Sequence, residues 1–115
     1  MDKRRESRVA HDLKFIAQIH ECLDDPELEG ESIVCAAIDF SHHGLRLHTD
    51  KALVPNTLLN ITISIGDPPI EYKLRGEIRW TKILDNNCHM GVVFSEEKGA
   101  DLDAWGAHID RLADV

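Results

Sequence analysis

The sequence predicts a small all-β domain of six strands with one helix at its C-terminal end. Three observations support this prediction. Short segments alternate apolar and polar residues with a period of two, turn-forming residues separate these segments, and apolar residues near the C-terminus recur at three- and four-residue steps. The chain has 115 residues, which is the size of one ordinary domain. We therefore expect a small barrel or sandwich that ends in an amphipathic helix.

The expected strands are separated by polar or glycine- and proline-containing segments. They span residues 13–20, 33–38, 45–49, 58–65, 72–80 and 89–94. The clearest is 58–65, where Leu59, Ile61, Ile63 and Ile65 alternate with polar side chains. Loops are expected at 24–31, 39–44, 66–69 and 85–87. The helical spacing near the end of the chain is carried by Leu102, Trp105, Ile109 and Leu112.

Composition and charge exclude several classes of protein. The formal net charge of −8 argues against a general DNA- or RNA-binding protein, because such binding requires many Lys and Arg residues on phosphates. No run of about 18 apolar residues is present, and the basic N-terminus does not lead into a signal-peptide core, so we expect a cytoplasmic protein without membrane insertion. The three cysteines have no CxxC-type spacing and are interpreted as reduced thiols.

Two short patterns contain residues suited to binding an anionic ligand. The first is RxxxR, formed by Arg4 and Arg8 and extended by Arg5. The second is DxSxxG between two expected strands, formed by Asp39, Ser41 and Gly44. Each pattern alone is common, since a basic tail often only solubilises a protein and Asp, Ser and Gly are ordinary turn residues. Their occurrence together, in this order and around six strands, is more specific.

The pair of motifs resembles the PilZ domain family, whose members carry RxxxR near the start and [D/N]xSxxG about thirty residues later. The resemblance extends to the segments 44–49, 75–80 and 90–94, and so covers nearly the whole chain. It implies an all-β fold, a six-stranded antiparallel β-barrel with a C-terminal α-helix. It also implies a single domain with a flexible basic ligand-binding arm at 1–10, the barrel at 11–95 and a helical segment at 96–115.

The resemblance further implies a cyclic di-GMP receptor that signals to a downstream effector protein and needs no cofactor. Arg4, Arg5 and Arg8 would contact guanine and phosphate, Asp39 and Ser41 would recognise guanine, and Gly44 would allow close backbone approach. These residue types suit the ligand. A guanidinium forks onto a phosphate or guanine O6 and N7, and a carboxylate accepts from the N1–H and N2–H₂ donors of guanine. Whether one ligand molecule or two would bind is left open.

Alternative interpretations are an enzyme, a metalloprotein and a PilZ-type adaptor that binds a protein but no nucleotide. An enzyme is not expected, since the sequence has neither a nucleophile elbow nor a phosphate-binding glycine loop. A metal site is not expected either, because His42 and His43 are adjacent on an extended chain and point in opposite directions. The adaptor is the second-ranked function. Arg79 is interpreted as part of a solvated face, and Trp80 and Trp105 as packing residues rather than a stacking platform.

Overall fold

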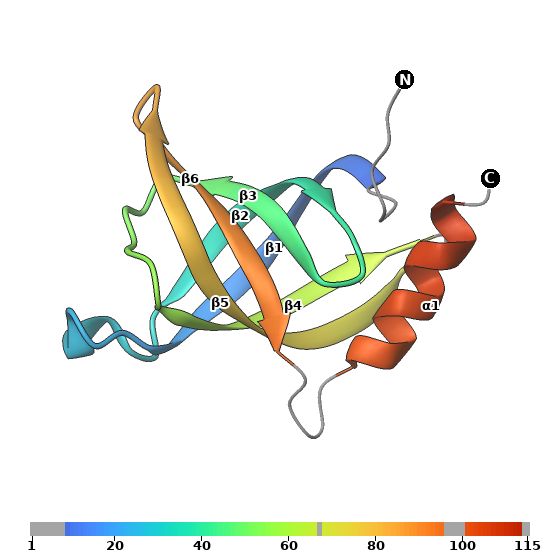
Figure 1. Cartoon of the computed structure of the whole chain (residues 1–115), viewed down its shortest axis with the longest axis horizontal. Coiled ribbons are helices and arrows are strands. Elements are labelled where there is room, and N and C mark those ends of the chain that lie inside the picture. Colours follow the sequence, from blue (N-terminus) through green and yellow to red (C-terminus); the bar gives the residue numbers. More distant parts are fainter. Residues whose placement is uncertain (1–8, 67, 96–100, 114–115) are drawn as a thin grey trace.

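The strands form a closed antiparallel barrel in the order β1-β2-β3-β6-β5-β4 (Figure 1). The computed structural model describes residues 9–66, 68–95 and 101–113, with side chains described from residue 13 to residue 111 within these ranges. In this part of the chain the strands are β1 (Val9–Glu21), β2 (Ser32–Phe40), β3 (Gly44–Thr49), β4 (Leu58–Ile65), β5 (Ile70–Leu84) and β6 (Asn87–Ser95). The expected barrel is confirmed.

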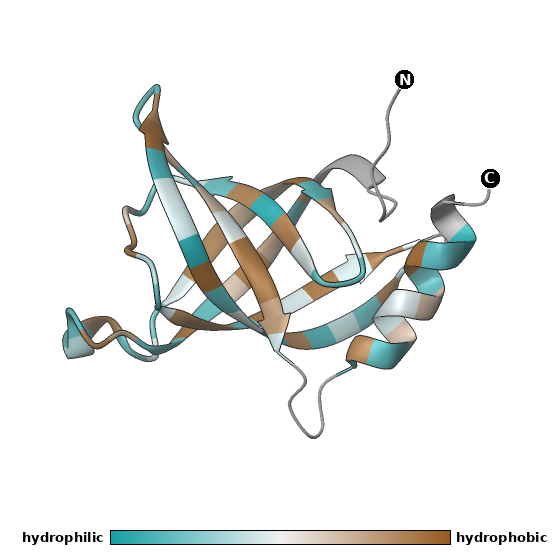
Figure 2. Ribbon diagram, viewed as in Figure 1, coloured by the Kyte–Doolittle hydropathy of each residue, from teal (hydrophilic) through white to brown (hydrophobic). Residues whose placement is uncertain are grey.

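Alternation of side chains places the core inside the barrel. On β4 the four apolar residues that alternate in the sequence are all buried, at 0–3% exposure, and the residues between them are half-buried. On β1, Phe15, Ala17 and Ile19 point inward in the same way, whereas Ile16 is 46% exposed. Figure 2 shows the resulting alternation of brown and teal along the ribbons. Successive side chains of a strand point to opposite faces, so one face of each strand contributes to a single core.

The helix α1 (Leu102–Ala113) covers one end of the barrel (Figure 1). Its residues Trp105 and Ile109 are completely buried. The ring of Trp105 lies 5.2 Å from that of Phe40, 5.6 Å from that of Tyr72 and 5.7 Å from that of Phe94, measured between centroids. The interpretation of Trp105 as a packing residue is therefore correct. Among the described residues, no helix is long and apolar enough to cross a membrane.

Several element boundaries differ from those expected, most clearly in β1 and β5. β1 begins at Val9 instead of after residue 10, because Val9 and Ala10 pair with Phe40 and Asp39 of β2. β5 extends at both ends of the expected 72–80, since its last residues continue to pair with β6 as far as Leu84. The loop at 24–31 contains one turn of 3₁₀ helix, η1 (Pro26–Leu28).

Candidate functional site

The DxSxxG segment forms the connection between β2 and β3, and α1 packs against it. The backbone N–H of Ser41 donates to the carbonyl of Gly44 at 2.9 Å, which closes a tight turn. The backbone N–H of Phe94 donates to the carbonyl of His43 at 2.8 Å and ties the turn to β6. The indole Nε1 of Trp105 donates to the carbonyl oxygen of Ser41 at 2.8 Å. The turn is thus fixed from two sides, and Ser41 itself is only 1% exposed.

Asp39 is joined to Arg46 across the β2–β3 pair. A register shift between Ala37 and Asp39 makes Asp39 the direct partner of Arg46. The Nε of Arg46 lies 3.1 Å from each carboxylate oxygen of Asp39, and Nη2 also donates to Oδ2. The Asp39 side chain is 10% exposed, whereas that of Arg46 is 50% exposed. Hydrogen bonding to this carboxylate raises the pKa of Arg46, so its guanidinium stays charged.

Gly44 is needed for close approach of two strands. A methyl group at this position would overlap the carbonyl oxygen of Val92 on β6 and lie 3.4 Å from its carbonyl carbon. Gly44 is not among the residues with positive φ, so its role is not to permit a left-handed turn. The described contact at Gly44 is with the backbone of the neighbouring strand, and its expected close approach to a ligand stays a prediction.

A β-bulge on β5 brings Arg79 and Trp80 to the outer surface together. Ile78 pairs with Val92 and Trp80 pairs with Gly91, which leaves Arg79 as the extra residue. Alternation is therefore interrupted. Ile78 is buried, whereas both Arg79 and Trp80 are exposed, Trp80 at 44%. The alternation expected for this strand, which would point Trp80 inward with Ile78, is wrong at Trp80: the ring lies outside the barrel, where it packs against Gly91 of β6.

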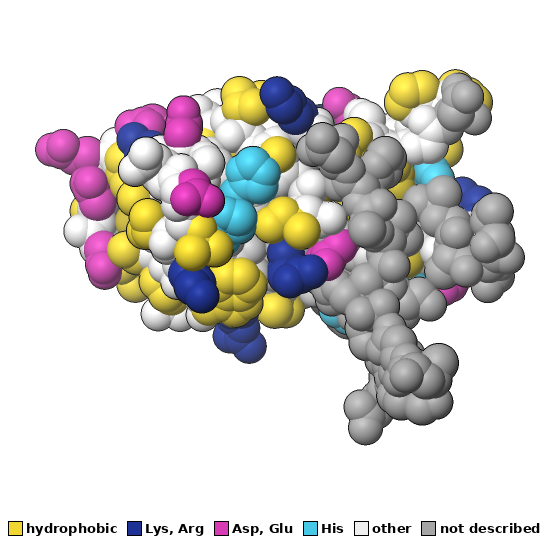
Figure 3. All heavy atoms as spheres, turned by 90° about the horizontal axis from the view of Figure 1, so that it is seen from above, with side chains coloured by type: hydrophobic (Ala, Val, Ile, Leu, Met, Phe, Trp, Pro, Cys, Tyr) yellow, Lys and Arg dark blue, Asp and Glu magenta, His cyan; other side chains and the backbone are white. Residues whose placement is uncertain are grey.

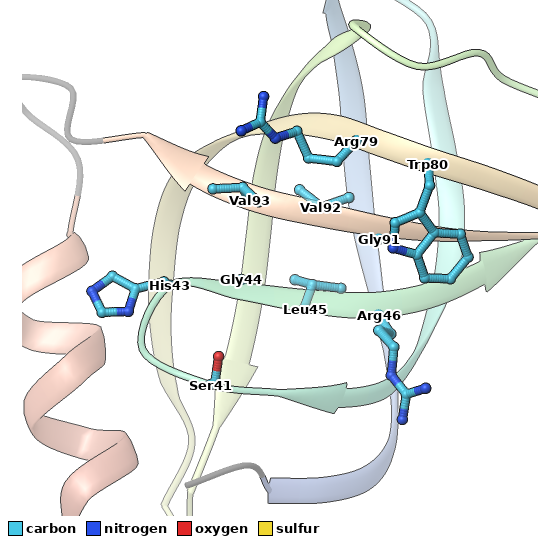
Figure 4. A pocket seen from close by; sticks show the side chains of 10 residues that line it. All are labelled: Ser41, His43, Gly44, Leu45, Arg46, Arg79, Trp80, Gly91, Val92 and Val93. Carbon is cyan, nitrogen blue, oxygen red and sulfur yellow. The ribbon is translucent and has the colours of Figure 1, made fainter. Parts of the chain in front are cut away.

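These residues surround a hollow of about 440 Å³ on the outer surface of β3, β5 and β6 (Figure 4). Ser41 and Gly44, both predicted, line it together with His43, Arg46, Arg79 and Trp80, which were not predicted as site residues. Asp39 is not in the lining but contacts it through Arg46. The hollow combines two guanidinium groups and an aromatic ring, which are groups that bind phosphates and flat nitrogen bases.

The surface around the hollow is less acidic than the net charge of the whole chain suggests. In Figure 3, hydrophobic, basic and histidine side chains lie together in the middle of the visible face, while acidic side chains gather toward its left-hand end. Next to the hollow, the rings of His48 on β3 and His89 on β6 stack with their centroids 5.3 Å apart. Lys82 of β5 is the register partner of His89 on the other side. Each arginine of the hollow has a carboxylate partner, since Arg46 is hydrogen-bonded to Asp39 and Nη1 of Arg79 lies 3.9 Å from Oε1 of Glu77, so these paired side chains add little net charge.

The predicted arginines Arg4, Arg5 and Arg8 lie outside the described residues. Their attachment point does lie within them, because β1 begins at Val9, opposite Phe40, and Ala10 is opposite Asp39. The segment that carries RxxxR therefore joins the barrel beside the start of the DxSxxG segment. The sequence alone could not give this register, since β1 and β2 are separated by a ten-residue loop.

The histidines of the turn make contacts of their own with α1. Nε2 of His42 lies at hydrogen-bond distance, 2.7 Å, from Oδ1 of Asp110, and the ring lies over Gly106. Within the described part of the chain, no group of three or more His, Cys, Asp or Glu residues is placed to hold a metal ion. His42 is a contact between the turn and the helix.

Comparison with known proteins identifies one family. The model of the family described as PilZ domain matches residues 2–111. No curated protein sequence matches the chain. Several solved structures are similar at low sequence identity, and this similarity concerns the fold.

Three of the similar structures are described here, each with a TM-score above 0.6. The inhibitor of motility MotI/DgrA of Bacillus subtilis has a TM-score of 0.71 at 14% identity, covering 97% of this chain and 52% of its own. The PilZ domain of YcgR from Escherichia coli, solved with c-di-GMP, has a TM-score of 0.65 at 12% identity, covering 98% and 90%. MrkH, described as a c-di-GMP-dependent transcription regulatory factor, has a TM-score of 0.66 at 17% identity. The chain spans about half the length of MotI/DgrA and of MrkH.

Proposed function

The chain belongs to the PilZ domain family, and we propose that it is a cyclic di-GMP receptor that signals to a downstream protein. The observation that carries the proposal is the shared location of the two motifs. Ser41 and Gly44 line the hollow, Asp39 contacts it through Arg46, and the strand that follows RxxxR begins opposite Phe40 and Asp39. A ligand in the hollow would therefore lie within reach of both motifs.

The chemistry of the hollow suits this ligand. Cyclic di-GMP has two anionic phosphodiesters and two guanines. Arg46 and Arg79 supply N–H donors for phosphate oxygens or for guanine O6 and N7, and Arg4, Arg5 and Arg8 would add cations from the arm. Asp39 would accept from the N1–H and N2–H₂ donors of guanine, which adenine lacks, by exchanging part of its contact with Arg46 for the base. The structures of the YcgR PilZ domain with c-di-GMP and of the MrkH–c-di-GMP complex support the choice of ligand.

The output is proposed to be a change of surface rather than a reaction. Ligand binding would fix residues of the arm across the hollow and neutralise the arm cations Arg4, Arg5 and Arg8, so that a partner meets a different face. The absence of DNA binding stays a prediction. MrkH is described as a transcription regulatory factor, so the structural likeness gives no argument against it.

Isothermal titration of the full chain with cyclic di-GMP tests the proposal, with GTP and cyclic di-AMP as matched controls. We expect saturable binding of cyclic di-GMP and much weaker binding of both controls. Chromatography of the nucleotide after incubation should recover it intact. The absence of binding would favour the nucleotide-free adaptor, and cleavage of the nucleotide would show an enzyme instead of a receptor.

A further inference from the structure

The strand β5 continues past the strand that flanks it on one side. β4 pairs with β5 only as far as Glu77, and the loop before β4 then bonds to both backbone groups of Ile78. β6 continues to pair with β5 as far as Leu84. Within the described part of the chain, residues 81–84 of β5 therefore have a strand neighbour on one side only. Figure 1 shows this end of β5, with its turn to β6, standing out from the barrel at the upper left.

The backbone groups on the open side belong to Thr81 and Ile83. Leu84 and Asn87 flank a two-residue turn whose residues both have positive φ, and in such a hairpin the flanking pair exchanges its backbone hydrogen bonds. Bonded and non-bonded pairs alternate along an antiparallel ladder. Lys82 therefore also bonds to β6, whereas Thr81 and Ile83 direct their N–H and C=O groups away from it. These groups are placed to bond to an extended chain that lies beside β5.

The side chains at this edge differ from those that usually protect one. Natural proteins blunt free strand edges with charged residues, prolines or bulges. Lys82 is such a charge, but the next two residues, Ile83 and Leu84, are 61% and 43% exposed. Ile83 lies on the inward face of β5, opposite the buried Cys88, and is exposed because β4 ends before it. A strand added here would continue the line of β4 and bury this side chain.

We propose that residues 81–84 of β5 bind an extended segment of a partner protein as an added strand, in which an apolar residue covers Ile83 and an acidic residue lies beside Lys82. Successive residues of a strand point to opposite faces, so the segment would carry apolar residues on both sides of the acidic one. Backbone hydrogen bonds supply the affinity in this mode of binding, and alternate side chains supply its specificity. The site lies outside the residues that line the hollow and is a second binding surface.

Two other occupants fit this edge less well. A second copy of the chain would use all the free backbone groups in the antiparallel register that pairs Thr81 of one copy with Ile83 of the other. That register places two copies of Lys82 opposite each other, and like charges directly opposite destabilise a strand pair. The basic N-terminal arm has the same disadvantage, since its arginines would approach Lys82. An acidic residue of another protein meets an attractive charge instead.

Amide hydrogen exchange of the full chain tests whether the edge is open. The amides of Thr81 and Ile83 should exchange roughly tenfold or more faster than that of Lys82, because only the last is bonded within the barrel. Equal protection of all three amides would show that the edge is already covered and would overturn the proposal. Sedimentation would then identify the occupant as a second copy if the chain is a dimer, or as a segment of the same chain if it is a monomer.

The partner chemistry is tested with the capped peptide Thr-Val-Glu-Val-Thr, titrated without nucleotide into the isotope-labelled full chain and followed by NMR. Shifts should concentrate at the amides of Thr81 and Ile83, and exchange of these amides should slow as the peptide binds. The same peptide N-methylated at both valines keeps its charge but cannot donate to the edge, and should bind much more weakly. Absence of binding, binding that leaves these amides unchanged, or equal binding of the methylated peptide would overturn the added strand.

A charge reversal tests the acidic preference. Lys82→Glu should weaken binding of the glutamate peptide and strengthen that of Thr-Val-Lys-Val-Thr, each about 2- to 5-fold. Lys14→Glu makes the same change of charge at an exposed position of β1 and should alter neither affinity. Equal effects of the two variants would overturn the acidic residue beside Lys82. Because no nucleotide is present, these outcomes leave the proposed receptor function intact, and failure of cyclic di-GMP binding leaves the edge site intact.

Discussion

Arg46 donates to both carboxylate oxygens of Asp39 across the β2–β3 pair, and its guanidinium extends from this contact into the hollow. The pairing uses the Nε and one Nη2 donor, and a guanidinium has five N–H donors in a planar fork. The buried carboxylate thus fixes the orientation of a half-exposed cation. DxSxxG therefore contributes a positioned arginine from the next strand as well as its own residues.

Replacing Arg46 tests this contribution. Arg46→Ala should weaken cyclic di-GMP binding roughly 10- to 150-fold, because a hydrogen bond to a charged group is worth about 1.5–3 kcal/mol. Arg46→Lys keeps the charge but loses the fork, and should retain part of the affinity. Titration calorimetry measures both. Lys82→Ala is the matched control, since it removes an exposed cation of β5 that does not line the hollow. An equal loss in this control would mean that only net charge matters.

A double-mutant cycle separates the two roles of Asp39. Asp39→Ala should weaken binding and reduce the preference for cyclic di-GMP over cyclic di-AMP, because an acceptor for guanine is lost. Since Asp39 and Arg46 are hydrogen-bonded, the two single losses should not add in the double variant. Titrations with both nucleotides give the four free energies of binding. Simple additivity would show that the residues act on the ligand independently, and an unchanged nucleotide preference would remove Asp39 from guanine recognition.

The barrel could be predicted because the signal for each strand lies in its own short stretch of sequence. The alternation on β4 and the turn residues around it depend on neighbours in the sequence, and the structure follows them. Trp105 was predictable for the same reason, since its spacing from Ile109 places both on one face of a helix. The three residues of DxSxxG were recognised from their spacing.

The rest of the hollow depends on register, which alternation does not determine. The bulge at Arg79 reverses the direction expected for Trp80, so a residue that reads as core lies on the surface. The pairing of Asp39 with Arg46 also follows from a register shift, between Ala37 and Asp39. One signal was present in the sequence: Gly91 is a strand glycine, and such a glycine often marks close approach of another group.

The stability of the barrel should depend on Gly44. Gly44→Ala would place a methyl group against the carbonyl of Val92, and neither backbone can move without disturbing the β3–β6 ladder. Overpacking of this kind costs about 1–3 kcal/mol. For a domain of this size, that corresponds to a fall in Tm of roughly 4–12 °C, measured by calorimetry. Gly30→Ala, at a loop position with open space but positive φ, is a useful comparison for strain without overlap. Unchanged melting of Gly44→Ala would show that the strands can separate at no cost.

Acidification should loosen the attachment of α1 through His108. Burial, and secondarily the charge of Arg111, lower the pKa of His108, and its Nδ1 lies 2.7 Å from the hydroxyl of Tyr72. The neutral ring is therefore favoured in the folded state. Because the unfolded histidine titrates near pH 6.5, this contribution is complete above that pH and is lost as the pH falls below it.

Urea unfolding at pH 7.5 and pH 5.5 measures this loss. His108→Gln should be less stable than the wild type at pH 7.5 but should show a smaller decrease on acidification. His42→Gln serves as the control on the same helix interface, since it removes a different histidine contact with α1, the one to Asp110. An identical pH dependence in the wild type and in His108→Gln would exclude His108 as its source.

A truncation that starts at Val9 should separate ligand binding from folding. Val9 and Ala10 pair with β2 and are retained, whereas a start at His11 would remove two paired residues of β1. We expect the truncated barrel to melt near the temperature of the full chain, because the described core lies between Phe15 and Ile109, and to lose most of its affinity for cyclic di-GMP with the cations Arg4, Arg5 and Arg8. A full-length variant with all three arginines replaced by glutamine keeps the chain length and should lose affinity to a similar extent.

In the wild type, cyclic di-GMP should protect the arm from trypsin, which cleaves after these residues. If the truncated barrel binds the dinucleotide as tightly as the full chain, the arm is only a solubilising tail and the proposed change of surface on binding is wrong.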